Sequence, residues 1–117
     1  ADYGARIGAD PMVREMFRRE IADSAQMIRR AYDAGVPLLA GSESGFSITP
    51  YGDWHYRELE VYVRDLGLTP LQAIQCATQA NAFALRMSGQ VGEISAGKLA
   101  DLLIVDGDPS KDVTVLG

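Results

Sequence analysis

Glu43 is the residue of this chain that is best placed to do chemistry. It stands in the sequence G-S-E-S-G, residues 41–45, directly after the apolar run V-P-L-L-A of residues 36–40. A carboxylate at the end of a buried strand can point into a cleft, and glycine and serine neighbours leave room there for a substrate. Carboxylates in clefts transfer protons or bind cations. Glu43 is therefore the first candidate for a functional residue.

Two serines flank Glu43, and the single histidine of the chain, His55, follows the loop. Ser42 and Ser44 either orient the carboxylate by hydrogen bonds or satisfy the turn, and the turn is the favoured interpretation. His55 opens a helix beyond the loop, where it contacts a substrate or serves the helix start and the surface. One histidine does not make a metal site of the kind that needs several histidine and carboxylate ligands.

The elements before this loop predict half of a βα repeat. Asp10 and Pro11 form a strong helix start, because a capping side chain precedes a proline in the first turn. Apolar residues then recur at helical spacing until Gly35, which ends the helix. The continuous apolar run of residues 36–40 is typical of a parallel strand that is buried on both faces.

Two further helices are expected after the loop. The first covers residues 54–66, and its core-facing residues are Leu59, Val63 and Leu66. The second begins at Thr69, and its apolar side comprises Leu71, Ile74, Ala77, Ala80 and Ala84. The connection between them is short, so the two helices are expected to turn back on each other.

Composition places the chain among ordinary globular proteins. It has 117 residues, of which 47% are hydrophobic and 23% charged, and this predicts one domain at most. A closed (β/α)₈ barrel needs roughly 250 residues, so the chain is too short to form one. The net charge of −5 argues against a nucleic-acid partner, because no basic stripe is present to neutralise phosphates.

The cysteine count and the apolar runs predict a cytoplasmic protein. The one cysteine, Cys76, excludes an internal disulfide and suits a reducing compartment. Its neighbours A-I-Q-C-A-T resemble the buried face of a helix, which favours core packing over a nucleophilic role. No apolar run approaches the ~20 residues of a membrane span, and no signal-peptide pattern opens the chain. We therefore expect no membrane partner.

Two motifs in the C-terminal half resemble those of a known family. One is G-K-L-A-D-L-L-I-V-D-G-D-P, residues 97–109, and the other is T-P-L-Q-A-I-Q-C-A-T, residues 69–78. At this distance behind the G-S-E-S-G loop they resemble the C-terminal end of the amidohydrolase superfamily, in particular its imidazolonepropionase-like and prolidase-like members. The resemblance covers the chain from Met27 to its last residue.

The resemblance implies an α/β fold class. The chain would be the C-terminal segment of a TIM-barrel amidohydrolase, mostly helical, with one buried barrel-type strand at residues 36–40. Short C-terminal β-strands are expected at residues 91–94 and 102–105. Residues 1–88 would form the last αβα part of the barrel, and residues 89–117 the returning strands of a small β-domain. The missing N-terminal barrel portion would then be a partner of this chain.

The resemblance also assigns roles to residues. In the family the acidic residue after the last strand, usually aspartate, binds or approaches a divalent metal and takes a proton from the metal-bound water. This makes Glu43 the catalytic residue and a metal ligand, with zinc the favoured metal. Tyr51 stands near the place of a family histidine, so Tyr51 and His55 are expected to contact the substrate. Glu58 and Glu60 match a helix segment that is usually structural, and we interpret them as solvent or helix-dipole carboxylates near a helix N-terminus.

The leading hypothesis is a fragment or subunit of a metal-dependent amidohydrolase. It would hydrolyse carbon–nitrogen bonds of a small amide-like substrate by a metal-activated water. The family's other ligands, an early H-x-H among them, do not occur in these 117 residues, so we expect the isolated chain to be inactive. The alternative is a non-catalytic module that binds a partner or self-associates as a homo-oligomer. A small helical domain that retains only the ancestry stays open as a third interpretation.

Overall fold

The computed structural model describes residues 10–45 and 51–117. The first helix of the described residues, α2 (Pro11–Asp33), begins as its sequence predicts. An Asp10 carboxylate oxygen accepts a hydrogen bond from the Met12 amide at 2.7 Å, and Pro11 occupies the first turn. The helix ends before Gly35, whose φ of 87° lies in the left-handed region that glycine adopts without strain.

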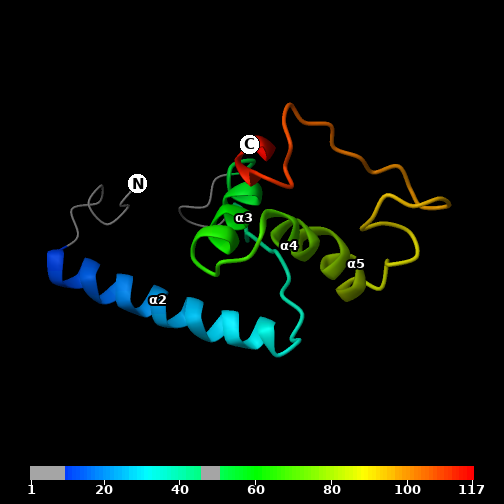
Figure 1. The fold of residues 1–117 in the computed structure, drawn as a ribbon. Coiled ribbons are helices and arrows are strands. Elements are labelled where there is room, and N and C mark those ends of the chain that lie inside the picture. The colour runs from blue at the N-terminus through cyan, green and yellow to red at the C-terminus, as the bar shows by residue number, and fades with distance from the viewer. Residues whose placement is uncertain (1–9, 46–50) are drawn as a thin grey trace.

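A second group of helices follows the G-S-E-S-G loop (Figure 1). It consists of α3 (Trp54–Arg64), α4 (Pro70–Gln75), a π-helical turn η1 (Cys76–Ala80), α5 (Asn81–Ala84) and, near the C-terminus, a 3₁₀ turn η2 (Val113–Leu116). In the chain, α4, η1 and α5 are continuous with one another. No helix in the described part of the chain is both long enough and apolar enough to cross a bilayer.

A small apolar core holds this second group together. Its centre is α3, which lies against both α4 and η2. The buried residues are Ala25, Leu59, Tyr62, Leu66, Leu68, Ala73, Cys76, Ala82 and Val113. The predictions that Leu59 and Leu66 face the core and that Cys76 is a packing residue are confirmed, and burial raises the pKa of the Cys76 thiol.

Helix α4 packs through smaller residues than its sequence suggests. Leu71, expected on the apolar side, is 51% exposed, whereas Ala73 is fully buried. Ala73 and Cys76 form the contact surface, because small side chains allow the helix to approach α3 closely. The expectation for Leu71 was therefore wrong.

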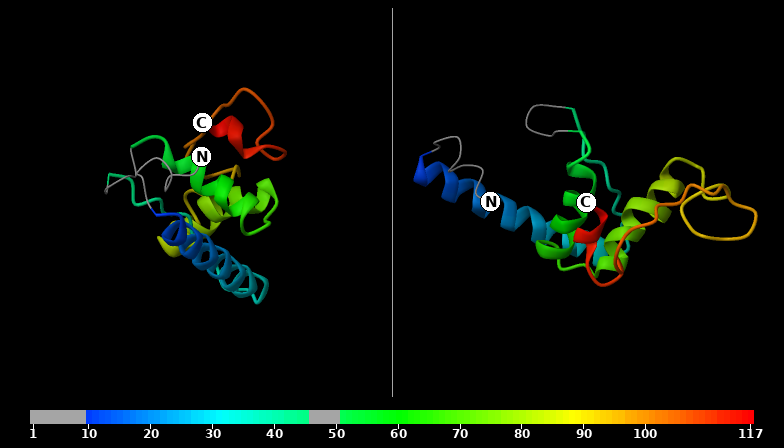
Figure 2. Two further views of the ribbon diagram at one scale, coloured as in Figure 1. Left: turned by 90° about the vertical axis from the view of Figure 1, so that its left-hand side faces the viewer. Right: turned by 90° about the horizontal axis from the view of Figure 1, so that it is seen from above.

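The molecule is open and elongated (Figure 2). Its radius of gyration is 16.1 Å, whereas a compact domain of this length has about 13 Å. Helix α2 accounts for much of this difference in radius, because most of the helix extends away from the core (Figure 2). Ala25 is its single buried residue. Apolar side chains of α2 such as Phe17 and Ile21 are 53% and 60% exposed. The described residues therefore do not cover the apolar side of α2.

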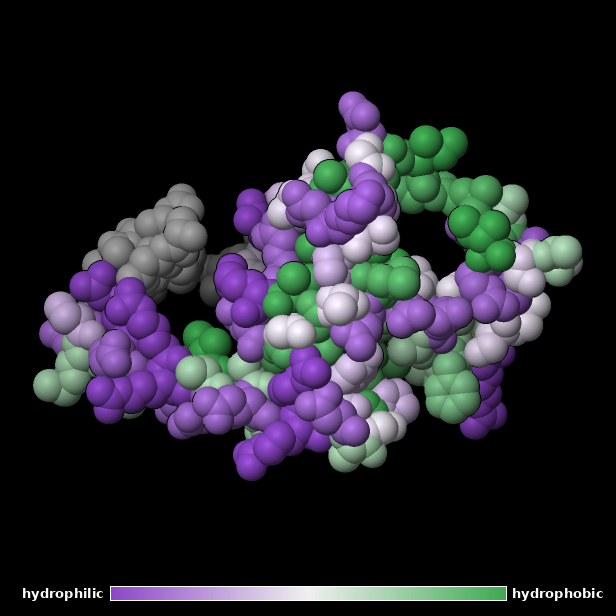
Figure 3. All heavy atoms as spheres, viewed as in Figure 1, coloured by the Kyte–Doolittle hydropathy of each residue, from purple (hydrophilic) through white to green (hydrophobic). Residues whose placement is uncertain are grey.

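The expected strands are absent from residues 10–45 and 51–117. The prediction of an α/β fold with a buried barrel-type strand and C-terminal β-strands was wrong for this chain. A strand needs a neighbouring strand to pair its backbone groups, and the described chain supplies no neighbour to residues 36–40 or 102–105. The second segment instead runs exposed toward η2, where apolar side chains gather at the upper right of Figure 3; Ile104 is 95% exposed.

The start of α4 gives a test of local stability. The Thr69 hydroxyl accepts from the Gln72 amide at 3.2 Å, and the Gln72 side chain accepts from the Thr69 amide at 2.9 Å. This is a complete capping box. Thr69→Ala should lower the free energy of unfolding in urea by about 1 kcal/mol. Thr69→Ser, which keeps the hydroxyl, should stay close to the unchanged protein, and equal losses in both variants would contradict the capping role.

Candidate functional site

A pocket of about 490 Å³ lies around the G-S-E-S-G loop. The loop contributes Glu43 and its two serine neighbours, and Tyr51 follows from beyond the loop. Helix α3 adds His55 and Glu58, and Asn81 comes from the start of α5. The three residues singled out by the sequence, Glu43, Tyr51 and His55, thus line one pocket, while their roles stay predictions.

Glu43 has an unusual backbone conformation. Its φ is 49°, in the left-handed region that residues other than glycine seldom adopt. Gly45 two residues later has a φ of 96°, so the chain turns sharply on both sides of Ser44. Strained backbone of this kind persists only where the surroundings hold it, and it is often found at functional sites.

The two serines link the loop to α3. The hydroxyl oxygens of Ser42 and Ser44 lie 2.8 Å apart, and the Ser42 hydroxyl lies 3.2 Å from His55 Nδ1. These hydrogen bonds agree with the preferred interpretation that the serines satisfy the turn. They also bring the imidazole of His55, which is exposed, to the edge of the pocket.

Tyr51 closes the other side of the loop. Its side chain is 81% exposed. The phenol nevertheless lies so close to Gly45 that a Cβ atom added at this glycine would overlap the hydroxyl. The glycine at position 45 is therefore required both by its φ and by the place of Tyr51.

Asn81, Glu58 and Tyr62 hold the chain just before Glu43, a role that the sequence motifs did not predict. The Asn81 side chain bonds the backbone of Ala40 on both sides, with its Oδ1 3.2 Å from the amide and its Nδ2 2.9 Å from the carbonyl. Glu58 accepts from the Gly41 amide at 3.1 Å. Glu58 is half-buried, and its bond to the loop is a contact that the interpretation as a solvent or helix-dipole carboxylate did not include.

Tyr62 completes these contacts from the next turn of α3. Its hydroxyl lies 2.7 Å from the Leu39 carbonyl and 3.0 Å from Glu58 Oε1. Burial is the main cause that raises the pKa of Tyr62, and the nearby Glu58 charge raises it further. The spacing of His55, Glu58 and Tyr62 at i, i+3 and i+7 puts them on one helix face, a signal that the sequence already contained. For Asn81 the one sequence signal is an amide between alanines on a helix.

The described residues do not complete a metal site. Within residues 10–45 and 51–117, no group of three or more His, Cys, Asp or Glu side chains is close enough together to hold a metal ion. Glu43 and His55 have suitable donor atoms, but a site of the usual kind needs more ligands than these two. A metal beside Glu43 would need ligands from outside this part of the chain.

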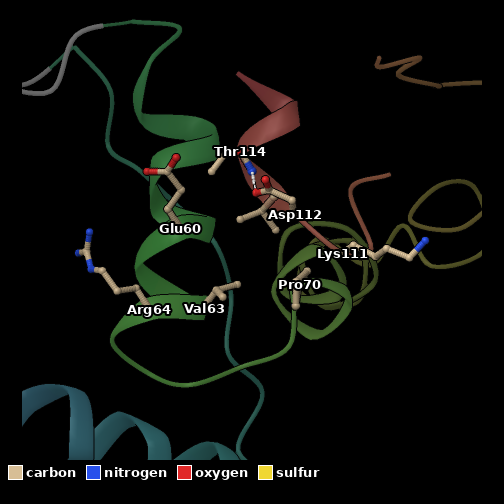
Figure 4. Close-up of a pocket in the computed structure, with 8 residues that line it drawn as sticks. Glu60, Val63, Arg64, Pro70, Lys111, Asp112 and Thr114 are labelled. Carbon is tan, nitrogen blue, oxygen red and sulfur yellow. Dashed lines mark hydrogen bonds between the residues drawn. The ribbon is translucent and has the colours of Figure 1, made fainter. Parts of the chain in front are cut away.

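A second pocket, of about 350 Å³, lies between α3, the start of α4 and η2 (Figure 4). Its two cationic groups are engaged locally: Arg64 pairs with Asp65 at 2.6 Å, and Lys111 pairs with Asp108 at 2.8 Å. The Asp112 carboxylate accepts from the Thr114 amide at 2.9 Å, which caps η2. Its polar groups thus serve the local fold, and the pocket around Glu43 is the better candidate for a site.

Comparison with known proteins identifies the family. Residues 13–117 match the model of the amidohydrolase family. The chain belongs to this family. It is 39% identical over 80 residues to an imidazolonepropionase of Streptomyces griseus, an alignment that spans 67% of this chain and 20% of that protein. It is also 51% identical over 41 residues to adenine deaminase 4 of Rhizobium meliloti, which covers 35% of this chain and 7% of the other.

A solved structure resembles the amidohydrolase chain in three dimensions. It is the crystal structure of a Xaa-Pro dipeptidase with bound methionine in the active site, which is 36% identical with a TM-score of 0.66. The match covers 79% of this chain and 22% of that chain. The chain thus spans about a fifth or less of these relatives, and its membership as predicted from the sequence motifs is confirmed.

The raised pKa of Tyr62 predicts a loss of stability at high pH. Below the pKa of an unfolded tyrosine, about 10, both states keep the proton and the contribution of Tyr62 is fully present. Above that pH the unfolded chain releases its proton first, so the contribution falls. Urea unfolding between about pH 8 and pH 11 should show a steeper decline for the unchanged protein than for Tyr62→Phe. Parallel declines would contradict this assignment.

Gly45 gives a test of the loop. Gly45→Ala should destabilise the loop, because alanine at a positive φ costs roughly 1 kcal/mol and its Cβ displaces the Tyr51 phenol. The ring resonances of Tyr51 and the amide resonances of Ser42 and Ser44 should shift in NMR spectra. Gly41→Ala is the matched control, since a Cβ at Gly41 meets nothing within 4 Å. Similar shifts in both variants would argue against the Tyr51 contact.

Proposed function

We propose that this chain supplies the proton-transferring carboxylate of a metal-dependent amidohydrolase that cleaves carbon–nitrogen bonds in small amide-like substrates. The observation that carries the proposal is Glu43, which lines a pocket of about 490 Å³ in a chain of the amidohydrolase family. The relatives are an imidazolonepropionase, an adenine deaminase and a Xaa-Pro dipeptidase by name, and membership of the amidohydrolase family supports hydrolysis as the reaction class.

The role proposed for Glu43 is to take a proton from the attacking water. A carboxylate is a competent base when it lies within hydrogen-bond reach of the water. The strained backbone of Glu43 supports the proposal, because strain is often retained at positions where a side chain must be aimed. His55 and Tyr51, on the two sides of the loop, are proposed to contact the substrate.

The proposed cofactor is a divalent metal, with zinc the first candidate. When bound, such a metal supplies an activated water at neutral pH. Glu43 would be one ligand, and the others would come from outside the described residues, which by themselves do not complete a site. Members of this family are generally metal-dependent, and this supports the cofactor but not its identity.

The proposed partner is the remainder of the amidohydrolase. Exposed apolar side chains along α2 support it, because a continuous apolar face is rarely left in water. The same face favours a second candidate function, a non-catalytic module that self-associates as a homo-oligomer. Light scattering of the purified chain separates them: a homo-oligomer would favour the module. The division at residues 88 and 89, and a cytoplasmic location, stay predictions.

The test of function is hydrolysis by the complete reading frame that contains this chain. Dipeptides, cyclic amides and aminopurines should be screened after removal of metal and again after addition of Zn²⁺ or Mn²⁺. Activity should require the metal, and Glu43→Gln should lower kcat by about a hundredfold or more. Glu43→Asp should keep more activity than Glu43→Gln, because it retains the carboxylate.

Glu60→Gln is the matched control, because Glu60 is a carboxylate on α3 that faces the second pocket. It should leave kcat and KM unchanged. Full activity of Glu43→Gln would refute the proposed role of Glu43. Metal-dependent hydrolysis by the isolated 117-residue chain would refute the expectation that other ligands are required.

A further inference from the structure

We propose that Asn81, Glu58 and Tyr62 are positioning residues. They fix the place of Glu43 through hydrogen bonds to the backbone of residues 39–41. The inference rests on the proposed function, in which Glu43 is the acting carboxylate. The three side chains come from α3 and α5, and the backbone that they hold ends one residue before Ser42 (Figure 1).

Asn81 makes the most specific of these contacts. An amide side chain offers an acceptor and a donor in one plane, so it can bond the amide and the carbonyl of a single residue. Asn81 does this to Ala40, with its Oδ1 accepting at 3.2 Å and its Nδ2 donating at 2.9 Å. The Nδ2 also lies 3.4 Å from the Ala77 carbonyl in η1, which restricts the side chain further.

The backbone geometry around Asn81 is itself unusual. Asn81 is the first residue of α5, directly after the π-helical turn η1. A π-turn inserts extra chain into a helix and turns the following residues relative to those before it, and such turns are frequent at functional sites. The helix therefore departs from its regular form at the place where it presents the amide to Ala40.

Glu58 and Tyr62 bond the other ends of the same two peptide groups. Glu58 Oε1 accepts from the Gly41 amide at 3.1 Å, and the Tyr62 hydroxyl lies 2.7 Å from the Leu39 carbonyl. The Tyr62 hydroxyl and Glu58 Oε1 are 3.0 Å apart, which couples the two contacts. The two peptide groups that join residues 39, 40 and 41 are thus each held at both ends by side chains rather than by a neighbouring strand.

These hydrogen bonds explain how Glu43 keeps its backbone conformation. A glutamate at φ 49° persists only if the surrounding structure over-determines it. Before Glu43 the chain is held through Gly41, and after it the hydroxyls of Ser42 and Ser44 bond each other. Because the chain is held before and after Glu43, its backbone has little freedom to relax. The Cα atom of Glu43 is therefore fixed beside the pocket.

The experiment is NMR on the 117-residue chain with Asn81→Leu, which removes both bonds to Ala40. Asn81→Asp keeps the acceptor for the Ala40 amide but loses the donor to its carbonyl. The matched control is Gln79→Leu, because Gln79 is an exposed amide on the same helical stretch that bonds Glu93 at 3.1 Å and not the loop. Amide exchange and the ¹³Cα and ¹³Cβ shifts of residues 39–44 are measured in all three.

In Asn81→Leu the Ala40 amide should exchange between about threefold and tenfold faster. The carbon shifts of Glu43 should move away from the left-handed region, while core amides such as that of Ala73 exchange as before. Asn81→Asp should keep Ala40 protected and move the Glu43 shifts less. Should Asn81→Leu fail to fold, the graded comparison of Asn81→Asp with Gln79→Leu decides the question.

The inference is overturned if the Glu43 shifts in Asn81→Leu match those in Gln79→Leu. It is also overturned if exchange rises equally throughout the core, since that pattern belongs to a merely structural residue. Neither readout needs hydrolysis or a metal. Failure of the positioning role is therefore separate from failure of the proposed function, which the Glu43 variants test by kcat.

Discussion

The need to satisfy backbone groups at residues 39–41 governs how this chain is built around its site. Peptide groups that leave water must find partners, and in a sheet a neighbouring strand would provide them. The described chain provides no such strand, so side chains make these hydrogen bonds. Asn81 bonds the amide and the carbonyl of Ala40, Glu58 bonds the Gly41 amide, and Tyr62 bonds the Leu39 carbonyl. Tyr62 belongs both to the apolar core and to this set of hydrogen bonds, so it links the packing of α3 to the loop.

The small core has a consequence for the site. On α3, Leu59 faces the core, whereas His55 and Glu58 line the pocket around the loop. One helix therefore supports the core and presents polar groups to the pocket, so a change in packing of α3 moves the site as well. By contrast α2 buries one residue, Ala25, and its apolar side chains are exposed in the described part of the chain.

Local sequence rules predicted the helices well and the strands badly. Helix starts depend on nearby residues, so Asp10 with Pro11 and Thr69 with Pro70 suffice to place them. A strand depends on a partner that local sequence does not contain. The apolar run at residues 36–40 satisfied the pattern for a buried strand, but the chain brings it side chains instead of a second strand.

The sequence by itself determined the family, through the motifs at residues 69–78 and 97–109. It also singled out Glu43, because a carboxylate among glycines and serines can be recognised from its neighbours in the sequence. Only the tertiary structure decided which groups surround that carboxylate. Asn81 lies 38 positions beyond Glu43 in the chain, in a run of small residues, and no local pattern connects the two. Their proximity arises from the packing of α3 and α5 around the loop, because hydrogen bonds between distant residues form only where the whole fold brings them together.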